Sequence, residues 1–396
     1  MTPELVTWLQ SAEAQALLAT IDPSQHLQSM SLLRRHVASD RAAALFELAT
    51  VRQLATRKFP DGDQLWFTRE ALEQASHSRV AQHRAAQFGQ RQLIADLCCG
   101  CGGDLLALAP HAPCIAVDSD STRVAMARAN IAHRGLGERV SIIEADVTTY
   151  ALPDHVDAVF FDPGRRSGGR RMFHHSDYHP PLTIATEWRR AGRIIAIKCA
   201  PGLDYHDLPL TPSFAIECVS LAGELRETVV WLDTPWPWQR RASVLNGTTT
   251  AQLDDTAPAH AVTYSAPQTF FYEPDVAVIR AGLVQQLAQQ MGAQMIDRQI
   301  AYLTSADYHA TPFARCWQVI DALPFNERIL KQTLRRLQAG AITVKKRGSP
   351  VDTDALAKRL SQPQGEALVV VLTQVADHHT AIICRGPYHP PEESLA

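Results

Sequence analysis

The sequence predicts an α/β fold whose central domain is a doubly wound, mostly parallel sheet. Short apolar runs alternate with helical segments between residues 93 and 200, which is the pattern of βαβ units. A glycine-rich segment lies directly after the first apolar run, and acidic residues lie at the ends of four successive runs. Because the carboxyl ends of parallel strands share one edge of a sheet, we expect a ligand site at that edge.

Composition limits the class of protein. The chain has 396 residues, 46% hydrophobic and 20% charged, which is ordinary for a globular protein of two or three domains. It has neither a long apolar stretch nor an early basic cluster, so we expect no membrane span, no secretory signal and a cytoplasmic location. The eight cysteines lack a second pair at zinc-ligand spacing, so we interpret them as reduced packing thiols and expect no metal site.

The first 60 residues or so are predicted to be helical, because apolar residues recur there at spacings of three and four. Pro60 and Gly62 end that run. Thr68 is a suitable N-cap for a second helix, which we predict to continue through Arg79 toward Phe88.

Five buried parallel strands are predicted at 93–97, 114–117, 140–143, 158–161 and 194–197, with helices at 121–132 and 182–190 among the connections. Two more strands, at 214–221 and 228–232, are expected to close the sheet in antiparallel orientation. After Trp238 we expect a hairpin that turns at Asn246-Gly247, a connector over 254–268 and a helix over 276–291. An α+β module is expected to follow. Its elements are helices at 326–337 and 353–360, a strand at 341–345 and a hairpin of 367–373 with 380–384.

The segment Asp96–Asp104 has the composition of a cofactor-binding loop. Glycines at a strand-to-helix turn let the backbone approach a ligand closely. Asp118 is placed to bind ribose hydroxyls and Asp146 to bind an adenine amino group. The loop lacks the G-x-G-x-x-G spacing of dinucleotide enzymes, so S-adenosylmethionine is the favoured cofactor. The predicted cofactor-binding residues are Asp96, Cys98, Gly100, Gly102, Gly103, Asp104, Asp118, Ser119, Asp146, Val147 and Asp162.

Residues after the fourth strand are predicted to face the substrate. Asp162 could orient, or take a proton from, an amino or ring N–H, and Lys198 at the end of the fifth strand is the second candidate catalytic residue. Arginines bind phosphate well, so the basic loop is expected to contact a polyanion. Its arginines are Arg165, Arg166, Arg170 and Arg171.

Two other chemistries stay open beside transfer to a base nitrogen, which we favour. Transfer to a ribose 2′-oxygen would use Lys58, Asp162, Lys198 and either Glu224 or Glu227. Transfer to pyrimidine C5 would use Cys199 as a nucleophile. The loop histidines His174, His175 and His179 lack metal partners at ligand spacing, and we interpret the loop as a lid or as plain surface.

The C-terminal module carries a second basic region, although the net charge of the chain is −3. Arg328, Lys331 and Arg335 share one helical face. A near-neutral protein with such a local patch is typical of a specific RNA enzyme. The predicted RNA contacts here are Lys331, Arg335, Lys345, Lys346 and Arg347.

Taken together, these motifs resemble a bacterial family of class I S-adenosylmethionine-dependent methyltransferases with a THUMP-like C-terminal domain. The resemblance is carried by Lys58–Pro60, Phe67–Ala75, Asp96–Asp104, Asp162-Pro163-x-Arg165-Arg166, Lys198-x-x-Pro201-Gly202, Glu273–Gly282 and Lys346–Gly348. One departure is Cys98-Cys99, where related loops more often have Gly-Cys-Gly.

The resemblance implies a Rossmann-like methyltransferase sheet and, because THUMP domains bind structured RNA, a tRNA or rRNA substrate. The expected domains are a helical segment (1–60), the methyltransferase domain (61–245), a hairpin and connector (246–270), a ferredoxin-like segment (271–323) and a THUMP-like domain (324–396). The alternatives are a methyltransferase of small molecules or proteins, and a module that binds the cofactor and RNA without catalysis.

Overall fold

The computed structural model describes residues 1–165, 175–205, 208–210 and 214–388. The chain forms two compact units: unit 1 comprises Met1–Ile216 and Arg226–Pro235, and unit 2 comprises Glu217–Leu225 and Trp236–Ala396. The chain passes from one unit to the other within β8 (Phe214–Leu221) and β9 (Glu224–Leu232). Among the described residues, no helix is long and apolar enough to cross a membrane.

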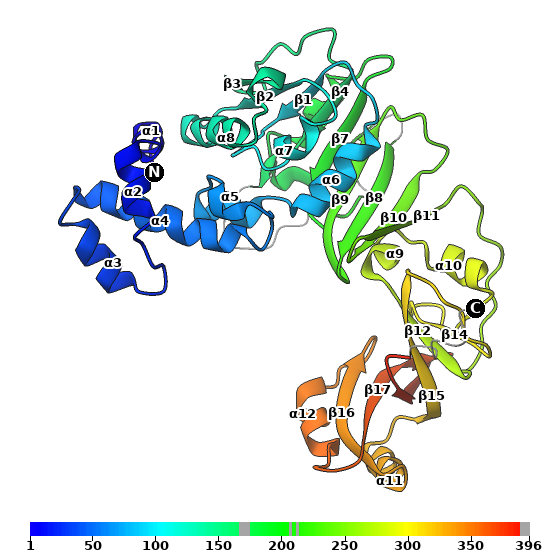
Figure 1. The fold of residues 1–396 in the computed structure, drawn as a ribbon. Coiled ribbons are helices and arrows are strands. Elements are labelled where there is room, and N and C mark those ends of the chain that lie inside the picture. The colour runs from blue at the N-terminus through cyan, green and yellow to red at the C-terminus, as the bar shows by residue number, and fades with distance from the viewer. Residues whose placement is uncertain (166–174, 206–207, 211–213, 389–396) are drawn as a thin grey trace. The chain divides into compact units, whose positions relative to one another are not determined.

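The N-terminal part of unit 1 is helical, as predicted. Its helices are α1 (Pro3–Leu9), α2 (Ala12–Leu18), α3 (His26–Leu33) and α4 (Ser39–Ala55). The side chains of Thr2 and Ser11 cap the first two helices, as short hydroxyl residues commonly do. α1 packs against α8 (Ser121–His133), one of the helices beside the sheet (Figure 1).

The single helix expected between Thr68 and Phe88 is wrong, because the structure has two. Thr68 does cap α5 (Arg69–Gln74), accepting a hydrogen bond from the Ala71 N–H, but α6 starts afresh at Ser78 and ends at Gln87. The Lys58 ammonium binds the carbonyl oxygens of Leu72, Glu73 and Ala75 at the end of α5. His77 Nδ1 then accepts a hydrogen bond from the Arg79 N–H and caps α6. Side chains therefore satisfy backbone groups at the end of α5 and at the start of α6.

A parallel sheet forms the core of unit 1, as predicted. Its strands are β1 (Ile94–Leu97), β2 (Cys114–Asp118), β3 (Val140–Glu144), β4 (Ala158–Phe161) and β7 (Ile194–Cys199). They are ordered β7-β4-β1-β2-β3, and β9 pairs antiparallel with β7. Figure 1 shows α6, α7 (Leu105–Leu108) and α8 beside this sheet. β1 and β4 are buried throughout, which is why these strands are unbroken apolar runs.

The helix predicted at 182–190 is mostly absent. Only a 3₁₀ helix, Leu182–Thr186, forms there. The carbonyl oxygen of Trp188 instead accepts a hydrogen bond of 2.8 Å from the guanidinium of the buried Arg193. A short antiparallel pair, β5 (Gly164–Arg165) with β6 (Tyr178–His179), precedes this segment.

Unit 2 contains the predicted hairpin, formed by β10 (Arg240–Asn246) and β11 (Thr249–Asp254), with Gly247 at a positive φ of 50° in the turn. The helix expected at 276–291 is divided into α9 (Val276–Arg280) and α10 (Val284–Met291). Gly282 lies between them with a left-handed φ of 68°, which interrupts a right-handed helix.

A mixed sheet dominates the rest of unit 2, in the order β13-β14-β12-β15-β18-β17-β16. Its strands are β12 (Phe270–Pro274), β13 (Gln294–Met295), β14 (Leu303–Ser305), β15 (Ala314–Pro324), β16 (Ala339–Lys346), β17 (Glu366–Val375) and β18 (His378–Arg385). β15 pairs with β12 on one side and with β18 on the other. The expected boundary between residues 323 and 324 therefore falls at the end of a strand that both parts of the sheet share.

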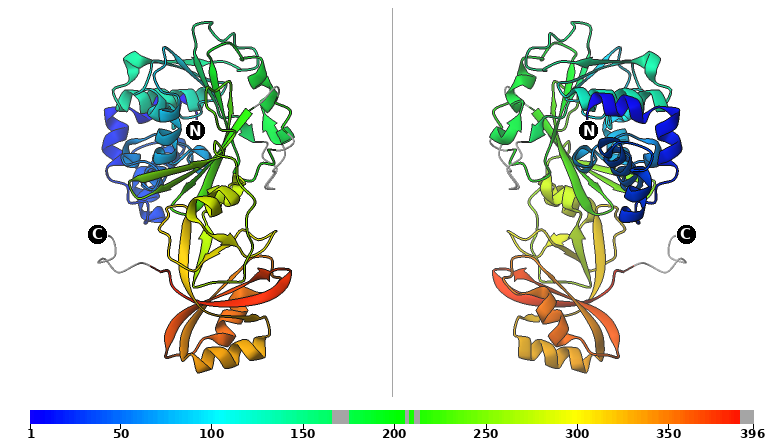
Figure 2. Two further views of the ribbon diagram at one scale, coloured as in Figure 1. Left: turned by 90° about the vertical axis from the view of Figure 1, so that its right-hand side faces the viewer. Right: turned by 90° about the vertical axis from the view of Figure 1, so that its left-hand side faces the viewer.

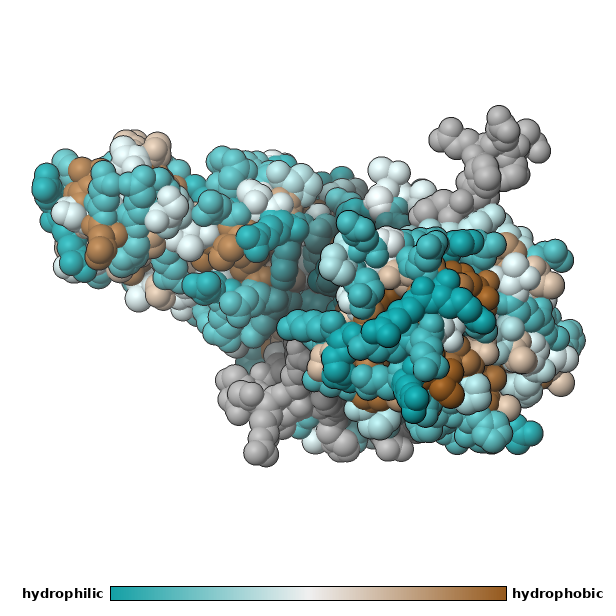
Figure 3. Space-filling view, turned by 90° about the horizontal axis from the view of Figure 1, so that it is seen from below, coloured by the Kyte–Doolittle hydropathy of each residue, from teal (hydrophilic) through white to brown (hydrophobic). Residues whose placement is uncertain are grey.

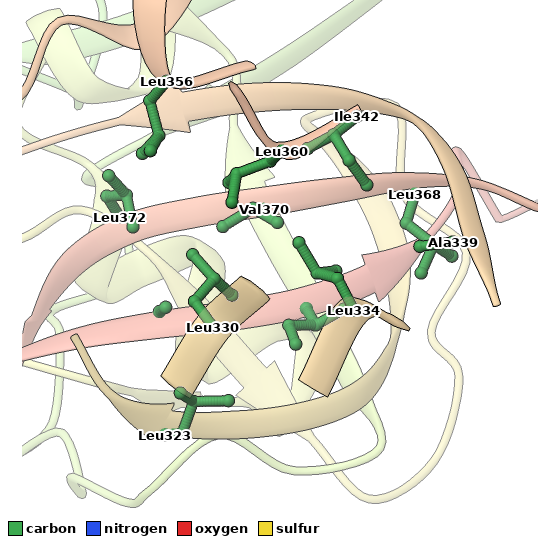
Figure 4. Packing of buried hydrophobic residues seen from close by; sticks show 12 residues of the cluster. Leu323, Leu330, Leu334, Ala339, Ile342, Leu356, Leu360, Leu368, Val370 and Leu372 are labelled. Atoms are coloured by element: carbon green, nitrogen blue, oxygen red, sulfur yellow. The ribbon is translucent and has the colours of Figure 1, made fainter. Parts of the chain in front are cut away.

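Helices α11 (Glu327–Arg336) and α12 (Thr353–Leu360) occur where the sequence predicted them. Figure 2 shows both helices on one face of the sheet. Figure 4 shows Leu330, Leu334, Leu356 and Leu360 pointing toward apolar side chains of the strands, and all four are buried. Figure 3, seen from below relative to Figure 1, shows a surface on which hydrophilic side chains prevail and hydrophobic residues appear only in patches.

Candidate active site

A cavity of about 470 Å³ lies at the carboxyl edge of the parallel sheet in unit 1. The loop after β1 lines one side of it, and residues at the ends of β2, β4 and β7 line the bottom: Asp118, Asp162 and Lys198. The segment that joins α4 to α6 lines the remaining side, from Arg57 to Val80. The predicted edge of the sheet is therefore the place where the structure is hollowed.

The loop after β1 turns sharply because several of its residues have left-handed backbone angles. Cys98, Gly100 and Gly102 have φ values of 64°, 54° and 78°. Cys98 adopts this angle although it has a Cβ, so the turn forms with a cysteine at this position. The Gly100 N–H donates to Asp118 Oδ2 over 2.8 Å, and Asp118 Oδ1 accepts from the Asp120 N–H. The Asp118 carboxylate is thereby fixed against the loop.

Asn130 of α8 ties the N-terminal segment to this loop. Its side chain exchanges hydrogen bonds with the backbone of Trp66, at 2.7 and 2.9 Å, and donates to the carbonyl oxygen of Cys101 over 2.8 Å. The stacked rings of Phe59 and Phe67 pack beside Gly103. The N-terminal segment is therefore part of the wall of the cavity.

A cluster of buried charges lies beneath the cavity, centred on Arg84 of α6. The Arg84 guanidinium contacts the Asp104 carboxylate, is 2.5 Å from the Glu227 carboxylate, and lies over the ring of Phe160 at 4.3 Å. Burial lowers the pKa of Arg84, but the attraction of Asp104 and Glu227 outweighs it and the pKa is raised. Arg84 is therefore a permanent cation in the interior.

Lys198 and Asp162 form an ion pair in the lining of the cavity. Lys198 Nζ is 2.6 Å from Asp162 Oδ2 and 3.7 Å from Asp104 Oδ2. Burial lowers the pKa of Lys198, but the attraction of Asp162 and Asp104 raises it by more. The pKa of Lys198 therefore lies above its ordinary value. Burial raises the pKa of Asp162, and Lys198 offsets only part of that rise. The Asp162 side chain is 31% exposed, so a substrate in the cavity can reach it.

Asp96 is fully buried behind the loop, and both of its carboxylate oxygens lack a hydrogen-bond partner among the described residues. Burial raises the pKa of Asp96 well above its ordinary value, and Asp104 and Asp162 add to the rise. An unpaired buried carboxylate is unfavourable unless it is protonated, so we expect Asp96 to carry a proton.

The residues of the two alternative chemistries are placed differently. The Lys58 ammonium is committed to three backbone carbonyls, and burial, together with Lys198 and Arg226, lowers its pKa to about 8. Glu227 is paired with Arg84, and Glu224 does not line the cavity. Cys199 does line it, but burial raises the pKa of its thiol.

The structure gathers some of the predicted cofactor-binding residues and not others. Those that line the cavity are Cys98, Gly100, Gly103, Asp104, Asp118 and Asp162. Those outside its lining are Asp96, Gly102, Ser119, Asp146 and Val147. Asp146 is exposed and accepts hydrogen bonds from the backbone and hydroxyl of Thr148. Its position after β3 is thus a turn at the surface, which the spacing alone could not reveal.

The predicted substrate residues fall into separate groups. Arg166, Arg170 and Arg171, with His174, lie outside the described residues, and for Arg165 only the backbone is described. In unit 2, Lys331 and Arg335 are on α11, whereas Lys345 and Lys346 end β16 and Arg347 follows it. β16 begins at Ala339, soon after α11 ends. The cations of α11 therefore lie toward the start of β16, and Lys345, Lys346 and Arg347 lie at its end.

Sequence reasoning missed Arg84, Asn130 and the pairing role of Glu227. Arg84 lies in the mostly polar helix α6, which also contains Arg79, Gln82 and His83, so the sequence carries no sign that this arginine is buried in an ion pair. Its partners are 20 and 143 residues away, so no local pattern could name them.

Comparisons with known proteins agree with this description. Residues 94–165 match the model of a methyltransferase domain family, and residues 314–386 match that of a THUMP domain-like family. An uncharacterized S-adenosylmethionine-dependent methyltransferase of Mycobacterium tuberculosis (strain H37Rv) is 38% identical over 360 residues, which is 87% of this chain and 98% of the relative.

Two more distant proteins are also similar. Trimethylguanosine synthase of Schizosaccharomyces pombe is 27% identical over 135 residues, covering 31% of this chain and 56% of that enzyme. The crystal structure of a protein from Porphyromonas gingivalis W83, assigned as a methyltransferase, has a TM-score of 0.75 and 21% identity, and the match covers 96% of this chain and 97% of that one. At that identity the likeness shows the shared fold.

Proposed function

We propose, from the premise that this chain belongs to the S-adenosylmethionine-dependent methyltransferase family, that it methylates a base nitrogen of tRNA or rRNA. The observation that carries the RNA part of the proposal is the THUMP-like domain on the same chain as the methyltransferase domain. The local similarity to an enzyme named for a methylated guanosine supports a nucleic-acid base as the acceptor.

The cavity in unit 1 suits S-adenosylmethionine, the cofactor of this family. The turn at Cys98–Gly102 lets the backbone approach a ligand, and the fixed Asp118 carboxylate suits the ribose hydroxyls. The carboxylates of Asp104 and Asp162 suit a sulfonium cation in the same cavity. When bound, this cofactor supplies an electrophilic methyl group.

The Lys198–Asp162 pair favours a nitrogen acceptor. Asp162 Oδ2 is held by Lys198, and Oδ1 makes no hydrogen bond to the described residues, so Oδ1 is available to an N–H of a base. The raised pKa of Asp162 makes its carboxylate a better proton acceptor than an ordinary aspartate. Asp162 therefore orients the acceptor nitrogen and takes its proton, while Lys198 fixes the carboxylate.

The same geometry argues against the two alternative chemistries. A lysine whose pKa is raised stays protonated at neutral pH, so Lys198 is a poor base for a ribose hydroxyl. A cysteine nucleophile needs its thiolate form, and burial raises the pKa of Cys199. These pKa directions support transfer to nitrogen over transfer to oxygen or carbon.

The test is methylation of RNA from a strain that lacks this protein, with the labelled cofactor and mass spectrometry of the nucleosides. We expect label in one N-methylated nucleoside. Asp162→Asn should lower turnover at saturating cofactor by about 100-fold or more, because positioned general bases contribute roughly 10²–10⁴-fold. Asp63→Asn, an exposed aspartate of unit 1, is the matched control. Label in protein or small molecules, or none in RNA, would contradict the proposal.

A further inference from the structure

A second cavity, of about 430 Å³, lies within unit 2. Its walls come from the turn between β8 and β9, the end of β12, the start of β15 and the end of β16. Two sequence motifs that the methyl-transfer site does not use meet here, because Glu273 and Asp275 belong to one and Arg347 to the other. The volume is within the range of roughly 300–1,000 Å³ that is usual for small-molecule sites.

Two of the cations in this cavity are held in fixed positions. Lys345 Nζ is 2.5 Å from Glu273 Oε2 and lies over the Trp317 ring at 4.7 Å. Arg347 donates to the carbonyl oxygen of Ala301 over 2.7 Å and lies over the Tyr302 ring at 4.5 Å. Such contacts orient the charged groups before any ligand binds, which reduces the entropy lost on binding.

The two carboxylates in the cavity neutralise the three cations only in part. Glu273 is shared, because Arg347 Nη2 also lies 3.9 Å from its Oε1. Asp275 accepts a hydrogen bond of 2.8 Å from the Ala277 N–H and caps α9. Three cations, Arg315, Lys345 and Arg347, thus face two carboxylates that already have partners.

Arg315 is the cation that is available to a ligand. It is exposed, and its side chain makes no hydrogen bond or ion pair to the part of the chain that the structure describes. Gly223 leaves it room: a Cβ built on Gly223, whose φ is 78°, would lie 2.6 Å from Arg315 Nη2. A guanidinium in this position can donate two parallel hydrogen bonds to one anion.

We infer that this cavity binds a phosphate group, held by Arg315 and by the fixed charges of Lys345 and Arg347. The planar guanidinium matches a phosphate, and a net positive wall attracts one. The phosphate could belong to an RNA backbone or to a free phosphate compound. The inference rests on the proposed function only for the RNA source.

The experiment measures binding of inorganic pyrophosphate and of a short single-stranded RNA to the full chain with S-adenosylmethionine present. Arg315→Gln should weaken binding of the phosphate source by about tenfold or more, since hydrogen bonds between charged groups are among the strongest in proteins. Arg298→Gln is the matched control, because Arg298 is also exposed in unit 2 but does not line the cavity. Cofactor affinity of each variant is measured as the control for folding.

The outcomes separate this inference from the proposed function. If Arg315→Gln loses RNA binding and Arg298→Gln keeps it, the inference holds with RNA as the phosphate source. If the unaltered chain binds pyrophosphate but not RNA, and Arg315→Gln loses pyrophosphate binding, the inference holds with a free phosphate compound as the source. Equal binding by Arg315→Gln and Arg298→Gln, or no binding of either probe by the unaltered chain, overturns the inference. Methylation of RNA is measured separately, so its presence or absence decides only the proposed function.

Discussion

The guanidinium of Arg84 lies between the carboxylates of Asp104 and Glu227 in the interior of unit 1. Ser76 adds a hydrogen bond to the same network, through Asp104. Because Asp104 also lies near Lys198, the charge of Arg84 affects the Lys198–Asp162 ion pair that lines the cavity. At the scale of the residue, stability and chemistry of this site therefore depend on the same buried charges.

Replacing Arg84 by methionine should strongly destabilise the protein. The substitution leaves two buried carboxylates without their cation, and breaking a buried pair in this way costs about 3–5 kcal/mol. Denaturant unfolding followed by circular dichroism measures the loss. Arg128→Met on the exposed side of α8 is the control and should change stability by no more than about 0.5 kcal/mol. Equal stability of the two variants would show that the buried network is unimportant.

The pH dependence of methyl transfer should report the ionisation of Asp162. Burial raises its pKa, so activity should fall on acidification at a pH above the ordinary aspartate value of about 4. Lys198 lowers that pKa, so Lys198→Met should move the acidic limb of the pH–rate profile to higher pH. Lys198 itself has a raised pKa, so the unaltered protein should lose no activity from its deprotonation near pH 8. An acidic limb that does not move in Lys198→Met would contradict this assignment.

At the scale of the element, the loop after β1 is held by parts of the chain on either side of it. Asp118 at the end of β2 accepts a hydrogen bond from the Gly100 N–H. Asn130 of α8 makes hydrogen bonds both to the loop and to the segment before α5. The positive φ angles in the loop are thus maintained by specific hydrogen bonds as well as by glycine.

Asn130→Ala should loosen this arrangement. The substitution leaves the Trp66 N–H and the carbonyl oxygens of Trp66 and Cys101 without their side-chain partner. We expect a stability loss of roughly 3 kcal/mol or more, because three buried groups lose their partner and each unsatisfied group costs about 1–3 kcal/mol. Affinity for S-adenosylmethionine should also fall, and titration calorimetry measures it. Asn246→Ala, at an exposed position in unit 2, should leave that affinity unchanged.

The whole molecule combines a net charge of −3 with local groups of cations. On α11, the side chains of Arg328, Lys331 and Arg335 make no hydrogen bond or ion pair to any described residue, whereas Glu327 and Arg336 are paired with Arg359 and Asp321. A near-neutral protein that binds RNA does so through a few discrete cations. The slope of log K against log salt then reports how many of these cations contact phosphates.

Replacing Arg328, Lys331 and Arg335 together by glutamine should therefore weaken RNA binding and flatten its salt dependence. Each phosphate contact to a single strand contributes about 0.7 to the slope of log K against log salt, so the slope should fall by about two units. Fluorescence anisotropy over a series of salt concentrations measures it. The substituted residues lie in unit 2, so affinity for the cofactor should not change. An unchanged slope would remove α11 from the RNA-binding surface.

Local sequence patterns predict the order and type of most elements. Buried strands such as β1 and β4 are continuous apolar runs, helix caps such as Thr68 are local, and the glycine turn after β1 is encoded within a few residues. The sequence also predicted that Asp118, Asp162 and Lys198 lie at one edge of the sheet, where all three line the cavity, because strand ends of a parallel sheet must meet at one edge. The combination of motifs also indicated the family, because each motif is a pattern of a few neighbouring residues.

Long-range packing determines which polar groups lie in contact. Arg84 with Glu227, Asn130 with Trp66, and Lys345 with Glu273 are pairs separated by 64 to 143 residues, and no periodicity relates such positions. The break between α5 and α6 likewise depends on Lys58, a residue outside both helices. Local propensity fixes elements over a few residues, whereas ion pairs, pKa values and cavities depend on what long-range packing brings together.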